Sequence, residues 1–180
     1  DRATTTRLIT RRGSERIARF ACGLARDRRH LTIGHKANVL NSDTLFREIC
    51  IGAARDARVP VREKFIDALC LDILQHPGEY DVIVTENMFG DILSDVAAYL
   101  VGGLGMLPSG NIGDRWALFE PVHGSAPRHA GRNTANPVAA IRSAAMLLEN
   151  LGDGVNAVRI EDAIGNALVS GVRTRDLGGA

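Results

Sequence analysis

Two aspartates lie four residues apart in the run FGDILSD, at positions 91 and 95. On a helix this spacing places Asp91 and Asp95 on one face, with Cβ atoms roughly 5–6 Å apart, where like charges repel. A divalent cation would remove that repulsion, and hard carboxylate oxygens suit Mg²⁺ or Mn²⁺. A carboxylate in the first turn of a helix is also favoured without any metal, because the helix dipole attracts it. The pair alone therefore leaves both interpretations open.

Other residues of chemical interest lie at the expected ends of strands and in loops. Lys36 and Asn38 directly follow the alternating run at residues 31–35, which predicts a strand. In α/β sheets, ligands gather at the carboxyl ends of strands. The stretch GGLGMLPSGNIGD at residues 102–114 is too rich in glycine for an ordinary helix or strand, so the backbone must turn sharply there or approach something closely. A lysine taken alone is usually a surface residue.

The segment PVHGSAPRHAG at residues 121–131 is a second unusual loop. Its prolines and glycines preclude regular structure and leave backbone N–H groups free to face a ligand. A tight loop that holds a buried histidine is the alternative interpretation. The helix that follows has Asn136 as its predicted cap.

The elements that must position these residues alternate along the chain. Strands are predicted at residues 31–35, 61–66 and 81–85, each followed by a helix, at 44–58, 67–75 and 87–101. A first helix at residues 13–28 should pack through Ile17, Phe20, Ala21 and Leu24, and two more helices close the chain. Residues 41–43 are expected to cap the helix at 44–58. This alternation predicts an α/β fold, a sheet flanked by helices.

Composition excludes several classes of protein. A net charge of +1, from 22 basic and 21 acidic residues, offers no electrostatic case for binding nucleic acid or membrane. No apolar run approaches the 18 residues that a membrane span needs, so a cytoplasmic or organelle-matrix protein is expected. Cys22, Cys50 and Cys70 are odd in number and widely spaced, which predicts reduced thiols. The absence of an initial Met suggests a segment of a longer protein.

Several motifs, in this order and at these distances, resemble those of one enzyme family. They are HKANVL at 35–40, the helix start at Asp67, FGDILSD at 89–95, GGLGMLPSGNIGD at 102–114 and FEPVHGSAP at 119–127. Together they resemble the carboxyl-terminal part of the metal-dependent β-decarboxylating dehydrogenases, which act on isocitrate, homoisocitrate or 3-isopropylmalate. The resemblance implies that fold without its amino-terminal part. Residues 1–101 would form the smaller, dimer-forming α/β domain and residues 102–180 part of the coenzyme-binding domain.

The resemblance also implies a role for each acidic residue. Asp91 and Asp95, with Asp67, would hold Mg²⁺ or Mn²⁺, and Lys36 would be the general base that receives the hydroxyl proton of the substrate. In the family, the equivalents of Lys36 and Asp67 serve the metal site of the neighbouring subunit. The protein would then be a homodimer with shared active sites.

The coenzyme, NADP or NAD, would lie against residues of the second loop. Its adenosine half would contact His123, Gly124, Ser125, Ala126 and Asn136, with Asn38 near the nicotinamide. Members that use NAD have an acidic residue where this chain has Arg128, followed by His129. Arginine pairs with a 2′-phosphate, so these two residues favour NADP.

The expected reaction is oxidative decarboxylation of a 2-hydroxy acid. The sequence PSGNIGD followed by ALFE is nearer to the isocitrate and homoisocitrate members than to the isopropylmalate members, which commonly read PSASLG. The substrate-binding arginines and the catalytic tyrosine of the family would lie upstream of Asp1. A 3-isopropylmalate dehydrogenase, a noncatalytic regulatory subunit and an inactive, self-pairing fragment remain alternatives. The intact Lys36, Asp67, Asp91 and Asp95 argue against a noncatalytic subunit.

Overall fold

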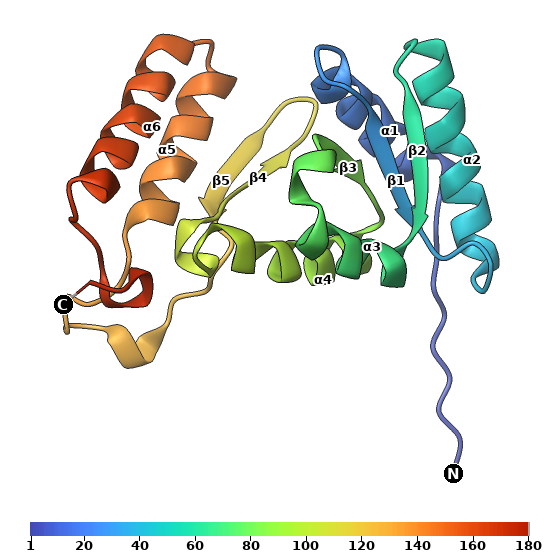
Figure 1. Ribbon diagram of the computed structural model, residues 1–180. Coiled ribbons are helices and arrows are strands. Elements are labelled where there is room, and N and C mark those ends of the chain that lie inside the picture. Colours follow the sequence, from blue (N-terminus) through green and yellow to red (C-terminus); the bar gives the residue numbers. More distant parts are fainter. Residues whose placement is uncertain (180) are drawn as a thin grey trace. The chain divides into compact units, whose positions relative to one another are not determined.

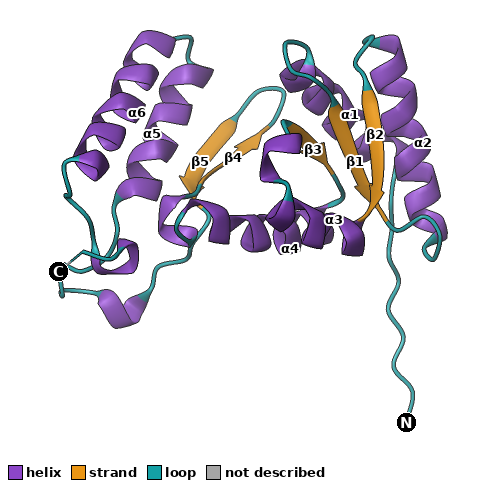
Figure 2. Ribbon diagram, viewed as in Figure 1, coloured by secondary structure: helices purple, strands orange, loops and turns teal. Residues whose placement is uncertain are grey.

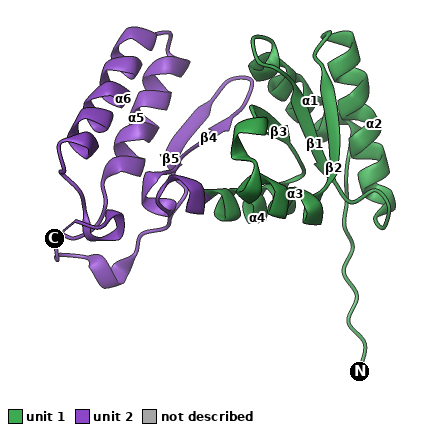
Figure 3. Cartoon of the chain, viewed as in Figure 1, with its two compact units in different colours: residues 1–97 green, residues 98–180 purple. Residues whose placement is uncertain are grey.

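The computed structural model describes residues 1–179. The chain divides into two compact units. The units comprise residues 1–97 and 98–180, coloured separately in Figure 3. The division falls at the end of a helix, shortly before the expected domain division after Val101. Within the described residues, no helix combines the length and the apolar character that crossing a bilayer would require.

The first unit is built on a sheet flanked by helices, as predicted, and its strands are parallel (Figure 1). Its strands are β1 (Leu31–His35), β2 (Val61–Phe65) and β3 (Val82–Val84), in the order β2-β1-β3. Leu31 pairs with Val61 on one side and with Val82 on the other. The helices of this unit are α1 (Arg11–Ala25), α2 (Asn41–Asp56), α3 (Ile66–Gln75) and α4 (Asn87–Ala98), shown in Figure 2.

Two hydrophobic clusters show that the sheet is covered on both faces. Leu31, Ile33 and Val84 pack with residues of α1 and α2. Ile83 packs in the other cluster, with residues of α3 and α4. Gly34 lets α3 approach the sheet closely, since a Cβ at this position would lie 2.9 Å from Leu69 Cδ2. The result is a three-layer arrangement in which each helix pair buries one face of the sheet.

Helix α1 packs through a face that only partly matches the one predicted. Its buried residues are small: Ser14, Ala18, Ala21, Cys22 and Ala25. Ile17, Phe20 and Leu24, which were expected to be buried, are 41%, 41% and 55% exposed. The small side chains allow α1 to lie close to α2 and to the sheet, and this closeness decides which face is buried. The prediction was therefore right for Ala21 and wrong for the three bulkier residues.

The second unit combines a hairpin with two long helices. Strands β4 (Pro108–Ile112) and β5 (Ala117–Pro121) pair antiparallel, and α5 (Val138–Asn150) and α6 (Gly154–Val169) follow. The expectation that residues 108–112 are irregular was wrong. A Cβ at Gly110 would lie 3.1 Å from Phe119 Cε1, so the glycine lets the Phe119 ring lie against its partner strand. Short 3₁₀ turns lie at Pro77–Glu79, Tyr99–Val101, Leu104–Met106, Pro127–His129 and Arg175–Leu177.

Candidate active site

Lys36 and Asp67 meet at the carboxyl edge of the parallel sheet. Lys36 follows β1, and Asp67 lies in the first turn of α3, directly after β2. Because β1 and β2 are neighbours in register, with His35 opposite Phe65, the residues after them emerge side by side. Lys36 Nζ donates a hydrogen bond to Asp67 Oδ1 and lies 5.6 Å from the centre of the Phe65 ring. The hydrogen bond from Lys36 holds the pKa of the Asp67 carboxyl below its usual value.

The backbone of Lys36 is held by Asp43, a residue that the sequence reasoning assigned to a helix cap. The N-cap of α2 is Leu40, and no side chain caps this helix. Asp43 Oδ2 instead accepts a hydrogen bond of 2.7 Å from the Lys36 N–H, and the Asp43 side chain is fully buried. The expected cap was wrong because Asp43 turns back toward the end of β1 and toward the half-buried Arg7. A fully buried carboxylate needs such partners.

Asp91 and Asp95 project from α4 and are both exposed. One turn of helix separates them, so their carboxylates lie on the same face. Within residues 1–179 neither forms an ion pair. The start of α4 is capped by Glu86, whose carboxylate oxygens accept hydrogen bonds of 3.1 Å from the N–H groups of Met88 and Phe89.

The predicted metal ligands form two separate groups in one chain. Among residues 1–179, no three His, Cys, Asp or Glu side chains converge on one point. Asp91 and Asp95 offer hard oxygen ligands without a competing cation, whereas Asp67 is occupied by Lys36. The Asp91–Asp95 pair therefore fits Mg²⁺ or Mn²⁺ if further ligands come from outside this chain. That is the division of ligands expected for a site shared between two subunits.

Most of the predicted coenzyme residues lie in one loop of the second unit. His123 Nδ1 lies 2.8 Å from the Gly124 carbonyl oxygen, and Ser125 is exposed. Ala126 has a φ of +44°, a left-handed backbone that a non-glycine residue rarely adopts. Such strain is often retained where a loop serves a ligand.

The remaining coenzyme candidates differ in how they are held. Asn136 Oδ1 accepts a hydrogen bond of 3.0 Å from the Val138 N–H at the start of α5, as its predicted capping role requires, although the N-cap position is Pro137. Arg128 and His129 are exposed in a 3₁₀ turn, and Arg128 has no ion-pair partner within the described residues. Asn38 is exposed in the turn after β1.

Sequence reasoning missed a cluster of charged residues on the first unit. Asp72 of α3 accepts hydrogen bonds from Lys64 of β2 and from the Tyr80 hydroxyl, and its Oδ1 lies 3.1 Å from His76 Nδ1. The Lys64 ammonium, followed by Tyr80 and His76, holds the pKa of the Asp72 carboxyl far below its usual value. The cluster joins α3 to β2 and to the segment before β3. The spacing of Asp72 and His76, four residues apart on a helix, was the available signal.

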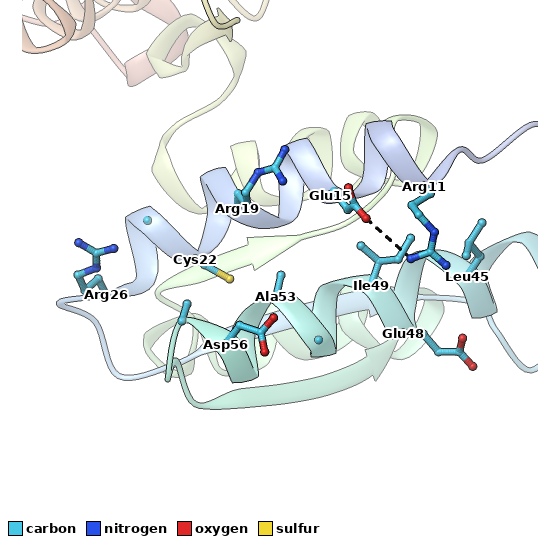
Figure 4. A pocket seen from close by; sticks show the side chains of 13 residues that line it. Arg11, Glu15, Arg19, Cys22, Arg26, Leu45, Glu48, Ile49, Ala53 and Asp56 are labelled. Atoms are coloured by element: carbon cyan, nitrogen blue, oxygen red, sulfur yellow. Dashed lines mark ion pairs between the residues drawn. The ribbon is translucent and has the colours of Figure 1, made fainter.

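One groove of the first unit lies away from the predicted site residues. It has a volume of about 750 Å³ and runs between α1 and α2, with Arg19 and Arg26 on one wall and Glu48 on the other (Figure 4). None of the predicted catalytic, metal or coenzyme residues lines it. Its size alone does not identify a functional site.

Comparison with known proteins gives one consistent result. The family model described as isocitrate/isopropylmalate dehydrogenase matches residues 1–180. The chain is 49% identical over 174 residues to an isocitrate/homoisocitrate dehydrogenase of Pyrococcus horikoshii, with 96% of this chain and 50% of that protein covered. It is 48% identical over 177 residues to a 3-isopropylmalate dehydrogenase of Archaeoglobus fulgidus, with 96% and 54% covered.

Solved structures agree with these sequence matches. The β-decarboxylating dehydrogenase of Thermococcus kodakarensis superimposes with a TM-score of 0.87 at 48% identity, over 99% of this chain and 53% of that one. The isocitrate dehydrogenase of Methylococcus capsulatus gives a TM-score of 0.92 at 44% identity, over 97% and 53%. The chain therefore spans about half the length of the relatives that it matches.

The contact between Lys36 and Asp67 predicts how one carboxyl titrates. Replacing Lys36 with Met removes the ammonium that stabilises the Asp67 carboxylate, so we expect the pKa of Asp67 to rise toward its usual value. Lys64→Met is the matched control, which should raise the pKa of Asp72 and leave that of Asp67 unchanged. Side-chain carbonyl NMR titration measures both. A pKa of Asp67 that does not move in Lys36→Met would contradict the contact.

Proposed function

Because this chain belongs to the isocitrate/isopropylmalate dehydrogenase family, we propose that it is part of an enzyme that oxidises a 2-hydroxy acid with NAD(P)⁺ and then releases the β-carboxylate as CO₂. The observation that carries this proposal is the intact set of chemical groups in the first unit. A lysine is hydrogen-bonded to an aspartate at the sheet edge, and two exposed carboxylates share one helix face. Loss of these groups would be expected in a noncatalytic subunit of the same fold.

Isocitrate or homoisocitrate is the proposed substrate. The sequence at residues 108–120 supports this choice because it is nearer to those members of the family than to the isopropylmalate members. Relatives of nearly equal identity carry both kinds of name, at 49% and 48%. 3-Isopropylmalate is therefore the alternative substrate.

Each residue of the proposed site has a distinct task. Acting as the base requires Lys36 to be the neutral amine, which accepts the proton of the substrate hydroxyl and becomes an ammonium as the neighbouring hydride leaves for NAD(P)⁺. Asp67 orients the Lys36 nitrogen through their hydrogen bond. Asp67, Asp91 and Asp95 hold Mg²⁺ or Mn²⁺. When bound, the ion would polarise the hydroxyl oxygen and, once oxidation has made that oxygen a carbonyl, would stabilise the negative charge that it takes up during decarboxylation. Loss of CO₂ leaves its bonding electrons on the substrate, where a proton later replaces the carboxylate.

A second copy of the chain is the proposed source of the missing ligands. The buried residues of α3 are Ile66, Leu69 and Ile73, yet its Leu71 is 59% exposed. On α4, Ile92 is 51% exposed. Helices that are apolar beyond the face they bury need an additional partner. A homodimer formed through these helices would bury the apolar surface and bring one chain's Asp67 to its partner's α4.

The loop at residues 121–131 is the proposed coenzyme site. The exposed Arg128 and His129 suit a phosphorylated ligand. Arg128 can pair bidentately with a 2′-phosphate, which supports NADP as the coenzyme. His123, Gly124, Ser125, Ala126 and Asn136 would contact the adenosine half, and Asn38 would lie near the nicotinamide.

An assay of the protein that contains this chain tests the proposed reaction. We expect reduction of NADP⁺ or NAD⁺ with isocitrate or homoisocitrate in the presence of Mn²⁺, together with release of CO₂. 3-Isopropylmalate is assayed in parallel and should react at least tenfold more slowly, a difference of about 1.4 kcal/mol in transition-state stabilisation. No turnover with any of the three acids and either coenzyme would favour the noncatalytic alternative.

The role of Arg128 can be tested by reversing its charge. In Arg128→Asp, a carboxylate would repel a 2′-phosphate and could accept hydrogen bonds from a ribose, so kcat/KM with NADP⁺ should fall relative to kcat/KM with NAD⁺ by about tenfold or more. Arg132→Asp, with the same charge change at another exposed position, serves as the control. An unchanged coenzyme ratio in Arg128→Asp would remove Arg128 from the proposed role.

A further inference from the structure

We propose that Arg7 is a positioning residue, which holds the Lys36 segment and the start of α4 together through the carboxylates of Asp43 and Glu86. The three residues Arg7, Asp43 and Glu86 are called the lock below. Arg7 lies before α1, outside every helix and strand, and the sequence analysis did not single it out. The importance of the two segments rests on the proposed function. The lock itself rests on contacts that are present without metal, substrate or coenzyme.

The first half of the lock holds the segment after β1. Asp43 Oδ2 accepts the Lys36 N–H at 2.7 Å, and its other oxygen, Oδ1, lies 2.7 Å from Arg7 Nη2. Asp43 therefore faces the catalytic lysine's backbone with one oxygen and the guanidinium with the other. Because the Asp43 side chain has no exposure to solvent, water cannot replace either partner.

The second half of the lock holds the start of α4. Glu86 Oε1 lies 3.0 Å from the same Arg7 nitrogen and also accepts the Phe89 N–H at 3.1 Å. Glu86 Oε2 accepts the Met88 N–H at 3.1 Å. One carboxylate thus caps the helix that carries Asp91 and also pairs with Arg7. A shift of Arg7 would be transmitted to the first turn of α4.

Arg7 is itself fixed in place. Its Cζ lies 5.0 Å from the centre of the Phe89 ring, a distance suited to a cation–π contact. The residues that follow Arg7 are held in place as well. Ile9 packs against the hydrophobic cluster of α1 and α2, and the Thr10 hydroxyl caps α1. The N–H groups of Arg7 do not point directly along its contacts with Asp43 and Glu86, so charge attraction is the main interaction.

The arrangement links the two separate groups of site residues within one chain. Lys36 and Asp67 form one group, and Asp91 and Asp95 form the other. In the proposed dimer these groups serve different active sites. The Arg7 guanidinium would then fix the position of the Lys36–Asp67 group relative to the Asp91–Asp95 group of the same chain. Residues that hydrogen-bond to metal ligands commonly position those ligands in this way.

The lock is tested first without metal, by amide hydrogen exchange of the whole protein. In Arg7→Met, peptides covering residues 36–40 and 86–92 should both exchange about tenfold faster or more, because both carboxylates lose their shared cation. Arg12→Met makes the same substitution at an exposed arginine and should change neither peptide. Ile49→Ala, in the core between α1 and α2, controls for a general loss of stability. Exchange that stays at the wild-type rate in either peptide of Arg7→Met would overturn the proposal.

Two milder variants keep the test decisive if Arg7→Met does not fold. Arg7→Lys retains the charge but replaces the guanidinium with a single nitrogen on a different stem, so both peptides should exchange faster than in the wild type. Glu86→Gln removes one ion pair and should speed exchange at residues 86–92 while leaving Asp43 paired. If Glu86→Gln exchanges like the wild type at residues 86–92, the second half of the lock does not exist.

Calorimetric titration with Mn²⁺ then connects the lock to the site. Arg7→Lys and Glu86→Gln should weaken Mn²⁺ binding by about 10–100-fold, the range found for residues that support metal ligands. Unchanged affinity in both would refute the positioning role. Asp91→Asn/Asp95→Asn serves as the positive control, and if it binds Mn²⁺ like the wild type, the proposed metal site fails. Exchange in the metal-free protein would still decide whether the lock exists.

Discussion

The parallel pairing of β1 with β2 and β3 is the constraint on which the candidate site depends. It brings the carboxyl ends of the strands to one edge, so that Lys36, Asp67 and Glu86 follow three neighbouring strands. Hydrophobic clusters on both faces hold this register, because a slip of one residue would turn Leu31 and Ile33 away from α1 and α2. The chemistry of the site is therefore positioned by the most buried part of the unit.

Charge balance explains the arrangement of polar residues at this edge. Asp43 is fully buried beside Arg7, and Asp67 accepts a hydrogen bond from Lys36. Each of these carboxylates thus has a cation or an N–H group, whereas Asp91 and Asp95 form no ion pair among residues 1–179. Two adjacent carboxylates without a cation repel, which supports a metal ion as their partner. The apolar faces of α3 and α4 supply an independent reason for a second chain.

Much of the fold was predictable from local patterns. The strand at residues 31–35 and the alternation of strands and helices follow from periodic apolar residues and were confirmed. The buried face of α1 was not predictable, because periodicity shows Ile17, Phe20 and Leu24 on one side but cannot show that close packing of alanines decides the contact. The β4 strand was missed because a glycine such as Gly110 is typical of loops. Only the tertiary structure shows that Gly110 pairs with Phe119 across the hairpin and makes room for its ring.

The site shows the same limit. Lys36 was singled out by its place at a strand end and Asp91 and Asp95 by their helix spacing, whereas Asp67 became a candidate only through the family resemblance. The structure brings Lys36 and Asp67 together. Arg7, Asp43 and Glu86 were not recognised as a group because their contacts join segments far apart in the sequence. Asp43 has the sequence context of a helix cap, and only tertiary structure reveals that it binds the Lys36 backbone. Long-range ion pairs leave no local pattern.

Subunit complementation tests most directly the claim that two chains build each active site. Lys36→Met and Asp91→Asn/Asp95→Asn, each inactive alone, are unfolded together and refolded as a mixture. Half of the dimers would then be mixed, and each mixed dimer would contain one site with both an intact lysine and intact aspartates, so about a quarter of wild-type kcat should return. If the mixture stays as inactive as its components while mixed dimers are shown to form, the shared site is contradicted.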